Sequence, residues 1–162
     1  MATALVTGGG SGIGREICKL LARDGFRVVI VSLLDDELDS VKAELAERYP
    51  AAQVITLQKD LSAPGAAADV HAELQARGLV VDVLVNNAGF GLWDEHLKLS
   101  AERVQSMLQL NMITLTTLCS LFGCDMAARG KGRILNIGST TSFHAMPYLA
   151  AYSASKSAAW SL

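Results

Sequence analysis

The stretch Thr7-Gly8-Gly9-Gly10-Ser11-Gly12-Ile13-Gly14 decides the fold of this chain. It follows Ala4-Leu5-Val6, which is typical of the end of a buried strand, and it opens a helical apolar pattern over 13–21 that stops at Asp24-Gly25. Glycines permit positive φ and carry no Cβ, so a pyrophosphate can approach backbone N–H groups at the positive end of that helix. The spacing Gly8-x-x-x-Gly12-x-Gly14 differs from the standard G-x-G-x-x-G fingerprint, and a glycine-rich loop on its own also suits a tight turn.

A second group of residues lies near the other end of the chain. Tyr152 precedes Lys156 by four residues, so on a helix the two side chains share one face. The ammonium group is then expected to lower the pKa of Tyr152 from about 10 toward neutrality, as a general acid or base requires. A Tyr-x-x-x-Lys spacing also arises by chance. It gains weight from Ser139, which ends an apolar run thirteen residues earlier, and from the glycine-rich turn.

The segments between these groups alternate between strand and helix patterns. The expected strands are continuous runs of Val, Ile and Leu, as a sheet covered on both faces requires, and this predicts parallel pairing. Gly25 and Gly130 are expected to follow helix ends, and Ser100 to cap a helix start. The pattern predicts an α/β fold, a single Rossmann-like domain with a doubly wound parallel sheet. The expected strands are 3–7, 27–32, 53–58, 81–86 and 133–138, and the expected helices are 13–24, 35–48, 65–77 and 100–129.

The chain resembles the short-chain dehydrogenase/reductase family. The run that starts at Thr7 is similar to the family's Thr-Gly-x-x-x-Gly-x-Gly, Asn86-Asn87-Ala88-Gly89 matches its Asn-Asn-Ala-Gly, and Tyr152-Ser153-Ala154-Ser155-Lys156 matches its Tyr-x-x-x-Lys. The resemblance covers the whole chain, with the motifs in the family's order and at its intervals. It implies strand order 3-2-1-4-5, a nicotinamide cofactor across the carboxyl ends of the strands, and interconversion of a carbonyl and an alcohol by hydride transfer.

The resemblance also implies a catalytic set of Asn111, Ser139, Tyr152 and Lys156. Tyr152 would exchange a proton with the substrate oxygen, and Lys156 would hold the nicotinamide ribose and stabilise the phenolate. Ser139 would hydrogen-bond the reacting oxygen, and Asn111 would anchor a water in the proton relay. Plainer alternatives exist: Ser139 is also placed to cap a loop, residues 140–142 compete with it, and Asn111 would serve as a hydrogen-bonded amide inside a helix.

The implied cofactor-binding residues lie in the glycine turn, at strand ends and in the Tyr-x-x-x-Lys motif. At the fourth strand, the missing side chain of Gly89 would let the backbone approach the cofactor. After the third strand, Asp60 would accept a hydrogen bond from the adenine amino group with Leu61 beside the ring, or would act only as a turn residue. The full set is Gly8, Ser11, Gly12, Ile13, Gly14, Ser32, Asp60, Leu61, Asn87, Ala88, Gly89, Tyr152 and Lys156.

The choice between NAD and NADP depends on the end of the second strand. An acidic residue there would bind the ribose 2′-OH of NAD, whereas a nearby Arg or Lys would bind the 2′-phosphate of NADP. The chain has the neutral Ser32 followed by Leu33, and Asp35 and Asp36 are placed to start the next helix. Together with the resemblance, Ser32 favours NADP over NAD. NAD becomes the alternative if Asp35 or Asp36 turns back toward the ribose.

Composition limits the expected partners. A net charge of −2 and a pI near 5.9 give no electrostatic case for nucleic acid or an anionic membrane. We expect neither a membrane span nor a signal peptide, because no apolar run of about 18 residues and no leader pattern occurs, and we therefore expect a cytoplasmic location. Three scattered histidines and the unpaired spacing of Cys18, Cys119 and Cys124 predict no metal site and no disulfide.

A small-molecule carbonyl or alcohol is the expected partner. Phe90, Leu92 and Trp93 follow the fourth-strand motif, and further apolar residues lie between Ser139 and Tyr152, so a hydrophobic substrate would suit the site. These apolar residues would equally serve as core contacts.

The length of the chain departs from the family pattern. Family members are longer, whereas this chain ends six residues after Lys156, so we expect the 1–162 domain to lack its C-terminal strands and cofactor lid. On that basis, residues 1–162 alone would be inactive and would associate through the edge of strand 133–138, and the full-length form would be a homo-oligomer. Two functions stay open: an NAD(P)-dependent short-chain dehydrogenase/reductase, or a non-catalytic nucleotide-binding or scaffold protein of the same fold.

Overall fold

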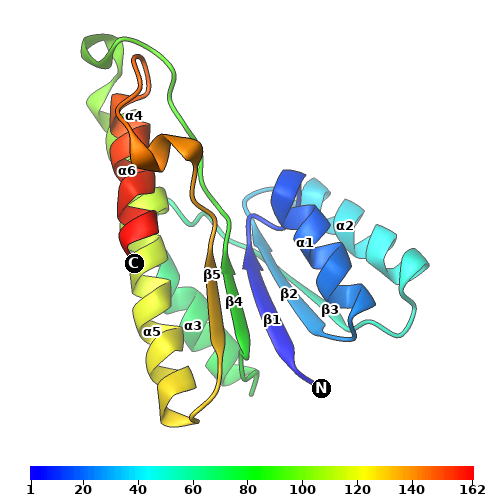
Figure 1. Cartoon of the computed structure of the whole chain (residues 1–162). Coiled ribbons are helices and arrows are strands. Elements are labelled where there is room, and N and C mark those ends of the chain that lie inside the picture. The colour runs from blue at the N-terminus through cyan, green and yellow to red at the C-terminus, as the bar shows by residue number, and fades with distance from the viewer.

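A five-stranded parallel sheet forms the centre of the protein, with strand order β3-β2-β1-β4-β5 (Figure 1). The computed structural model describes residues 1–162. The strands are β1 (Thr3–Thr7), β2 (Arg27–Ser32), β3 (Val54–Gln58), β4 (Val83–Asn86) and β5 (Arg133–Asn136). Leu5 of β1 pairs with Val29 of β2 on one side and Leu84 of β4 on the other. The order and the parallel pairing confirm the sequence prediction.

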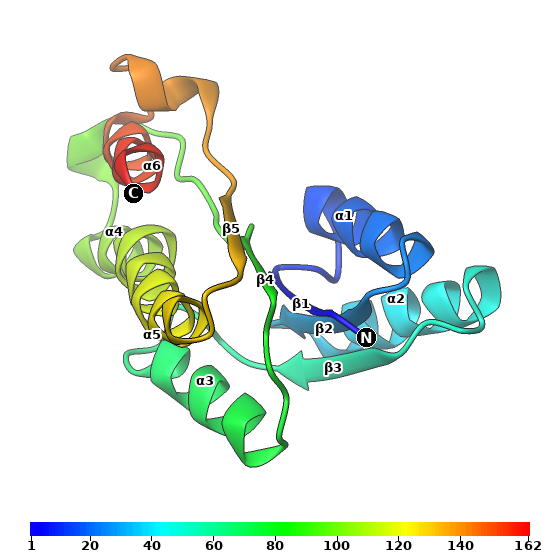
Figure 2. The same ribbon diagram turned by 60° about the horizontal axis from the view of Figure 1, so that its bottom comes forward.

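Helices cover both faces of the sheet (Figure 2). One face carries α1 (Gly12–Arg23) and α2 (Asp35–Arg48), and the other carries α3 (Ala66–Ala76) and α5 (Leu115–Ala128). α4 (Ala101–Leu108) precedes α5 along the chain, and α6 (Ala150–Ser161) packs against α4 and against residues 109–114. Two 3-10 turns, His96–Lys98 and Thr140–Phe143, belong to the arm that projects above the sheet in Figure 1.

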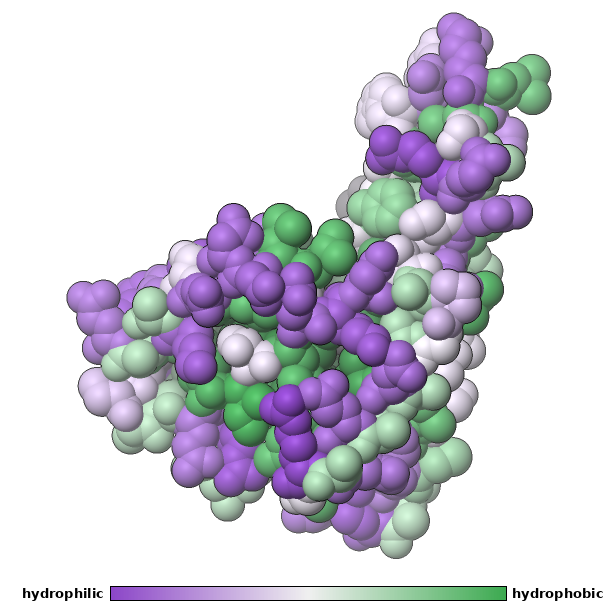
Figure 3. Space-filling model, turned by 180° about the vertical axis from the view of Figure 1, so that it is seen from behind, coloured by the Kyte–Doolittle hydropathy of each residue, from purple (hydrophilic) through white to green (hydrophobic).

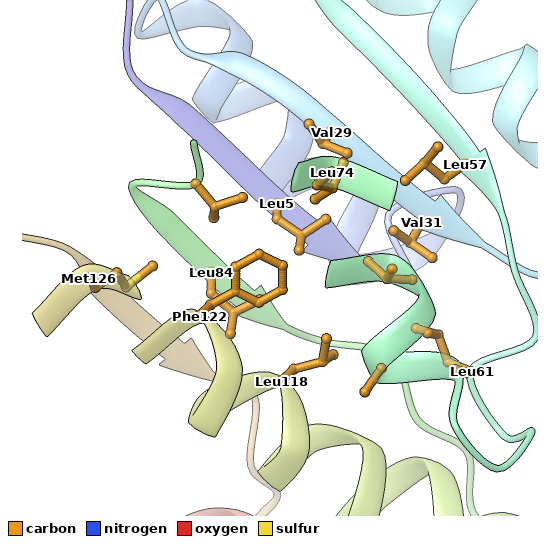
Figure 4. Packing of buried hydrophobic residues seen from close by; sticks show 14 residues of the cluster. Leu5, Val29, Val31, Leu57, Leu61, Leu74, Leu84, Leu118, Phe122 and Met126 are labelled. Carbon is orange, nitrogen blue, oxygen red and sulfur yellow. The ribbon is translucent and has the colours of Figure 1, made fainter. Parts of the chain in front are cut away.

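Alternation along the strands builds two hydrophobic cores. In β2, Val29 and Val31 point to the face covered by α3 and α5, whereas Val28 and Ile30 point to the face covered by α1 and α2. Figure 4 shows the first of these cores, in which Phe122 of α5 lies against the sheet. Full burial of each such side chain contributes roughly 1.5–3 kcal/mol, so a strand buried on both faces must be apolar at every position.

The long helix expected over 100–129 is not regular. A π-helical segment, η2 (Gln109–Thr114), separates α4 from α5. Such segments insert an extra residue into the helical turn and frequently occur at functional sites. The ends of the helix agree with the prediction: the Ser100 side chain accepts a hydrogen bond from Arg103 N at 3.2 Å, and Gly130 follows α5 with φ of 68°.

The stretch Ala101–Ala128 is long and apolar enough to cross a membrane by length and composition. Core helices of soluble proteins satisfy the same criterion, and 33% of the apolar 18-residue window within this stretch is buried inside the protein. The feature is therefore weak evidence for a membrane span, which the sequence alone did not predict.

The outer surface is uneven in polarity. β5 lies at the edge of the sheet, as expected, and its Ile134 and Leu135 are 39% and 47% exposed. Seen from the opposite side, hydrophobic residues gather in the middle of the body and are framed by hydrophilic ones (Figure 3).

Candidate active site

The carboxyl ends of β1 and β4 are joined through one threonine. Thr7 Oγ1 accepts hydrogen bonds from the backbone N–H groups of Asn87 and Ala88, both at 3.0 Å, and donates to Val85 O at 3.4 Å. Its hydroxyl thus satisfies two donors in a segment that leaves the sheet. The Asn-Asn-Ala-Gly motif is thereby fixed beside the glycine loop.

Asn87 then holds the glycine loop itself. Its Nδ2 donates to Thr7 O at 3.1 Å and to Gly8 O at 3.0 Å. The loop is so closely folded that a Cβ at Gly14 would lie 2.3 Å from Gly8 O and 2.5 Å from Asn87 Nδ2. The side-chain amide of Asn87 is therefore engaged in shaping the loop, and Gly14 is required by its own packing.

Replacement of Thr7 by Val should destabilise the protein by about 1–3 kcal/mol, because two backbone donors lose their acceptor while the shape is kept. Urea unfolding followed by circular dichroism would measure the loss. Thr56→Val in β3 is a matched control, since no hydrogen bond of the Thr56 side chain occurs in the structure, and it should change stability by less than about 0.5 kcal/mol. Equal effects of the two changes would contradict the role of Thr7.

A cavity of about 340 Å³ opens between the glycine loop and α6. The first turn of α1 faces it without an acidic side chain, so the positive helix end is not neutralised locally. Gly12 has φ of 53° and open space where a Cβ would stand, which leaves room for a ligand. The cavity brings together residues predicted from distant parts of the chain: Gly8, Ser11, Ile13, Asn87, Ala88, Gly89, Tyr152 and Lys156.

A second cavity, of about 170 Å³, lies along the ends of β2 and β3. Ser32, Asp60 and Leu61 line it together with Gly8, Ala88 and Gly89, which also line the first cavity. Asp60 Oδ1 also accepts hydrogen bonds from Ser62 N (2.8 Å) and Ser62 Oγ (2.6 Å). Asp60 therefore has the hydrogen bonds of a turn residue, as the alternative interpretation expected, and it also lines the cavity.

Two glycines after β4 allow the predicted catalytic residues to converge. A Cβ at Gly89 would lie 2.9 Å from Asn111 Oδ1 and 3.4 Å from Lys156 Nζ, and a Cβ at Gly91 would lie 3.3 Å from the Tyr152 ring. Lys156 is 6% exposed, and its Nζ donates to Ile137 O at 2.9 Å and lies 6.0 Å from the centre of the Tyr152 ring. Burial lowers the pKa of Lys156 below its ordinary value.

Asn111 lies within the π-helical segment and is almost completely buried. Its Oδ1 accepts from Phe90 N (3.2 Å), and its Nδ2 donates to Phe90 O (2.9 Å) and Ser155 Oγ (3.0 Å). The plainer alternative, a hydrogen-bonded amide inside a helix, is therefore what the structure contains. The same contacts hold the chain after β4 against α6, close to Lys156.

Ser139 caps the 3-10 turn Thr140–Phe143, so its plainer alternative is also present. Its Oγ accepts hydrogen bonds from Thr141 N at 3.2 Å and Thr141 Oγ1 at 3.0 Å, and no protein acceptor for its own hydroxyl proton occurs in the structure. Ser142, by contrast, uses its hydroxyl to donate to Lys156 O at 3.0 Å. The hydroxyl proton of Ser139 is therefore left for a ligand, whereas the hydroxyl proton of Ser142 is already used in a hydrogen bond.

The apolar residues considered for a substrate compartment do not form one cluster. Phe90 lines the cavity at β2 and β3, Trp93 is 67% exposed, and Phe143 packs edge-on against Trp160 with ring centres 4.7 Å apart. A further hollow of about 370 Å³ lies at the opposite end of the sheet between α3 and α5. None of the predicted site residues lines it.

Glu37 was missed by the sequence reasoning. Its Oε2 accepts a hydrogen bond from Ser32 Oγ at 3.1 Å, so a carboxylate stands at the strand end that the sequence alone suggests to be neutral. A Cβ at Gly10 would lie 2.9 Å from the same oxygen. The signal in the sequence was its place in the first turn of α2, next to Asp35 and Asp36.

A doubly wound sheet with a glycine loop, an unneutralised helix start and cavities at the carboxyl ends of the strands defines a dinucleotide-binding domain. The family model for short chain dehydrogenases matches residues 2–162, and this chain belongs to that family.

Curated relatives are about one third identical to the chain over the aligned residues. It is 31% identical over 159 residues to the very-long-chain 3-oxoacyl-CoA reductase of Bos taurus, covering 94% of this chain and 49% of the relative. It is 34% identical over 157 residues to 17-beta-hydroxysteroid dehydrogenase type 3 of Rattus norvegicus, covering 94% of this chain and 50% of the relative. The chain thus spans about half the length of these relatives.

Solved structures agree in fold. A short-chain dehydrogenase from Sphingobium yanoikuyae in complex with NADPH matches with a TM-score of 0.90 and 31% identity, over 98% of this chain and 62% of that one. An alcohol dehydrogenase from Comamonas testosteroni described as specific for bulky-bulky ketones matches with a TM-score of 0.91 and 30% identity, over 98% of this chain and 63% of that one.

Proposed function

We propose that the protein is an NAD(P)-dependent oxidoreductase that interconverts a carbonyl and an alcohol, with Tyr152 as the acid/base. The observation that carries the proposal is the 340 Å³ cavity, because it joins the glycine loop at one end of the sequence to Tyr152 and Lys156 at the other. Family membership and the NADPH complex of a structural relative support the same assignment.

The residues at the strand ends fit a dinucleotide. The start of α1 and the loop from Gly8 to Gly12 would hold the pyrophosphate, and the wall formed by Ser32, Asp60 and Leu61 would hold the adenosine. When bound, the nicotinamide supplies or accepts the hydride. Lys156, whose ammonium lies in the first cavity wall, would bind the neighbouring ribose.

The proton is handled by the chain itself. Tyr152 Oη would give a proton to the substrate oxygen in reduction and remove it in oxidation. Lys156 would stabilise the phenolate electrostatically, and its buried position strengthens that interaction. Ser139 would orient the substrate oxygen with the hydroxyl proton that Thr141 leaves free.

A hydrophobic carbonyl or alcohol is the proposed substrate class. The names of the relatives support it, because they refer to a very-long-chain 3-oxoacyl-CoA, to a hydroxysteroid and to bulky-bulky ketones.

The test is a spectrophotometric assay of NADPH and NADH oxidation by the full-length protein with bulky aromatic ketones, 3-oxoacyl thioesters and steroid ketones. We expect consumption of the reduced cofactor with at least one of these substrates, and formation of the corresponding alcohol by mass spectrometry. Cofactor binding by calorimetry without turnover would instead support the non-catalytic alternative. Absence of both binding and turnover would contradict each function.

A further inference from the structure

The carboxylate of Glu37 occupies the corner between β2 and the glycine loop. It accepts the hydrogen bond of Ser32 Oγ at 3.1 Å, and its Oε2 and Cβ would lie 2.9 and 2.8 Å from a Cβ at Gly10. Glu37 is half-buried and belongs to the first turn of α2, where a negative charge is favourable. Its position is therefore fixed from both sides, and its charge is stabilised where it lies.

This corner is where a doubly wound domain distinguishes the two dinucleotides. A carboxylate near the end of the second strand accepts the ribose 2′-OH, whereas a cation accepts the 2′-phosphate. Ser32 is the last residue of β2 and lines the 170 Å³ cavity, which places Glu37 one hydrogen bond away from the cavity wall. Leu33, which follows Ser32 in the same wall, brings no charge.

Two basic side chains of adjoining elements are already paired with carboxylates. Lys59, the one basic residue in the wall of the 170 Å³ cavity, lies 2.6 Å from Asp69 Oδ2. Arg15 of α1 lies 2.8 Å from Glu44 Oε2. With Lys59 and Arg15 neutralised by carboxylates, Glu37 is left as a local negative charge without a counter-ion.

We propose that Glu37 is a specificity-determining residue that disfavours a 2′-phosphate on the adenosine ribose. The inference rests on the proposed function, since it assumes that a nicotinamide dinucleotide lies along the strand ends. This role of Glu37 opposes the preference for NADP that the neutral Ser32 predicts. The Ser32 hydroxyl is bound to the Glu37 carboxylate, so the end of the strand carries a negative charge. Removal of the charge should therefore strengthen NADPH binding and leave NADH binding nearly unchanged.

The experiment compares Glu37→Gln with Asp39→Asn in the whole chain. Glutamine keeps the size of the side chain and an oxygen that accepts from Ser32, so the loop should keep its structure. Asp39 is an exposed acid on the same helix, and its replacement removes the same formal charge away from Ser32. Calorimetric titrations would give the dissociation constants for NADH and NADPH, and 2′-AMP and 5′-AMP would serve as probes without the nicotinamide.

We expect Glu37→Gln to lower the ratio of the NADPH to the NADH dissociation constant by roughly tenfold, and by less at high salt. Affinity for 2′-AMP should rise in parallel, whereas affinity for 5′-AMP should not. A ratio that shifts no more than in Asp39→Asn, while the parent chain binds either dinucleotide, overturns the role of Glu37 and leaves the proposed function intact. A parent chain that binds neither dinucleotide overturns both.

Discussion

Replacement of Tyr152 by Phe is expected to lower kcat by 10²–10⁴-fold, which is the usual contribution of a positioned general acid or base. The substitution removes only the hydroxyl group, so the proton for the substrate oxygen loses its source. The ring should stay in place, because Gly91 leaves it room and Lys156 Nζ still lies over its face, 6.0 Å from the ring centre. Affinity for NADPH and NADH should therefore remain near that of the parent protein.

The measurement is single-turnover oxidation of NADPH or NADH with whichever carbonyl substrate the parent accepts, together with calorimetric titration of the cofactor. Tyr148→Phe is a matched control, since it also removes a phenolic hydroxyl from the same segment and Tyr148 is largely exposed. Hydride transfer near the parental rate in Tyr152→Phe would mean that another residue donates the proton. Loss of cofactor binding would instead show that the hydroxyl supports the site rather than the chemistry.

Regular elements were predictable because each depends on a local pattern. The continuous apolar runs predicted strands buried on both faces, and alternation within β2 places Val29 and Ile30 in different cores. Ser100 caps its helix as expected, and Gly130 takes the left-handed conformation after α5. The doubly wound sheet followed from the handedness of the crossovers, whereas the order of the strands followed from the family resemblance alone.

Contacts between different structural elements were not predictable from local patterns. The bond from Ser32 to Glu37 depends on the angle at which α2 leaves the sheet, and nothing in the spacing of the two residues fixes that angle. The π-helical segment around Asn111 depends on the fit between α4, α5 and the chain after β4. Thr7 was named only as part of a motif, although its hydroxyl joins β1 to β4.

Replacement of Gly14 by Asp is expected to weaken dinucleotide binding by between roughly 5-fold and 1,000-fold, the range that one like charge about 4 Å from a phosphate gives between the dielectric constant of water and one of about 20. Two effects act together. The Cβ of the new side chain would lie 2.3 Å from Gly8 O, so the loop must change its conformation even without a ligand. The carboxylate would also place a negative charge in the first turn of α1, which has none.

The two effects can be separated with Gly14→Ala, which adds the bulk without the charge. We expect Gly14→Ala to destabilise the fold by about 1–3 kcal/mol, as overpacking usually does, and to weaken cofactor binding less than Asp does. Gly123→Ala is the control, because a Cβ there would meet only Ile134 Cδ1 at 3.7 Å and should stabilise α5 by roughly 0.5–1 kcal/mol. Calorimetry and thermal unfolding would measure both quantities. Unchanged cofactor affinity in Gly14→Asp would show that the pyrophosphate does not bind at the glycine loop, since a folded site there cannot accept a carboxylate without cost.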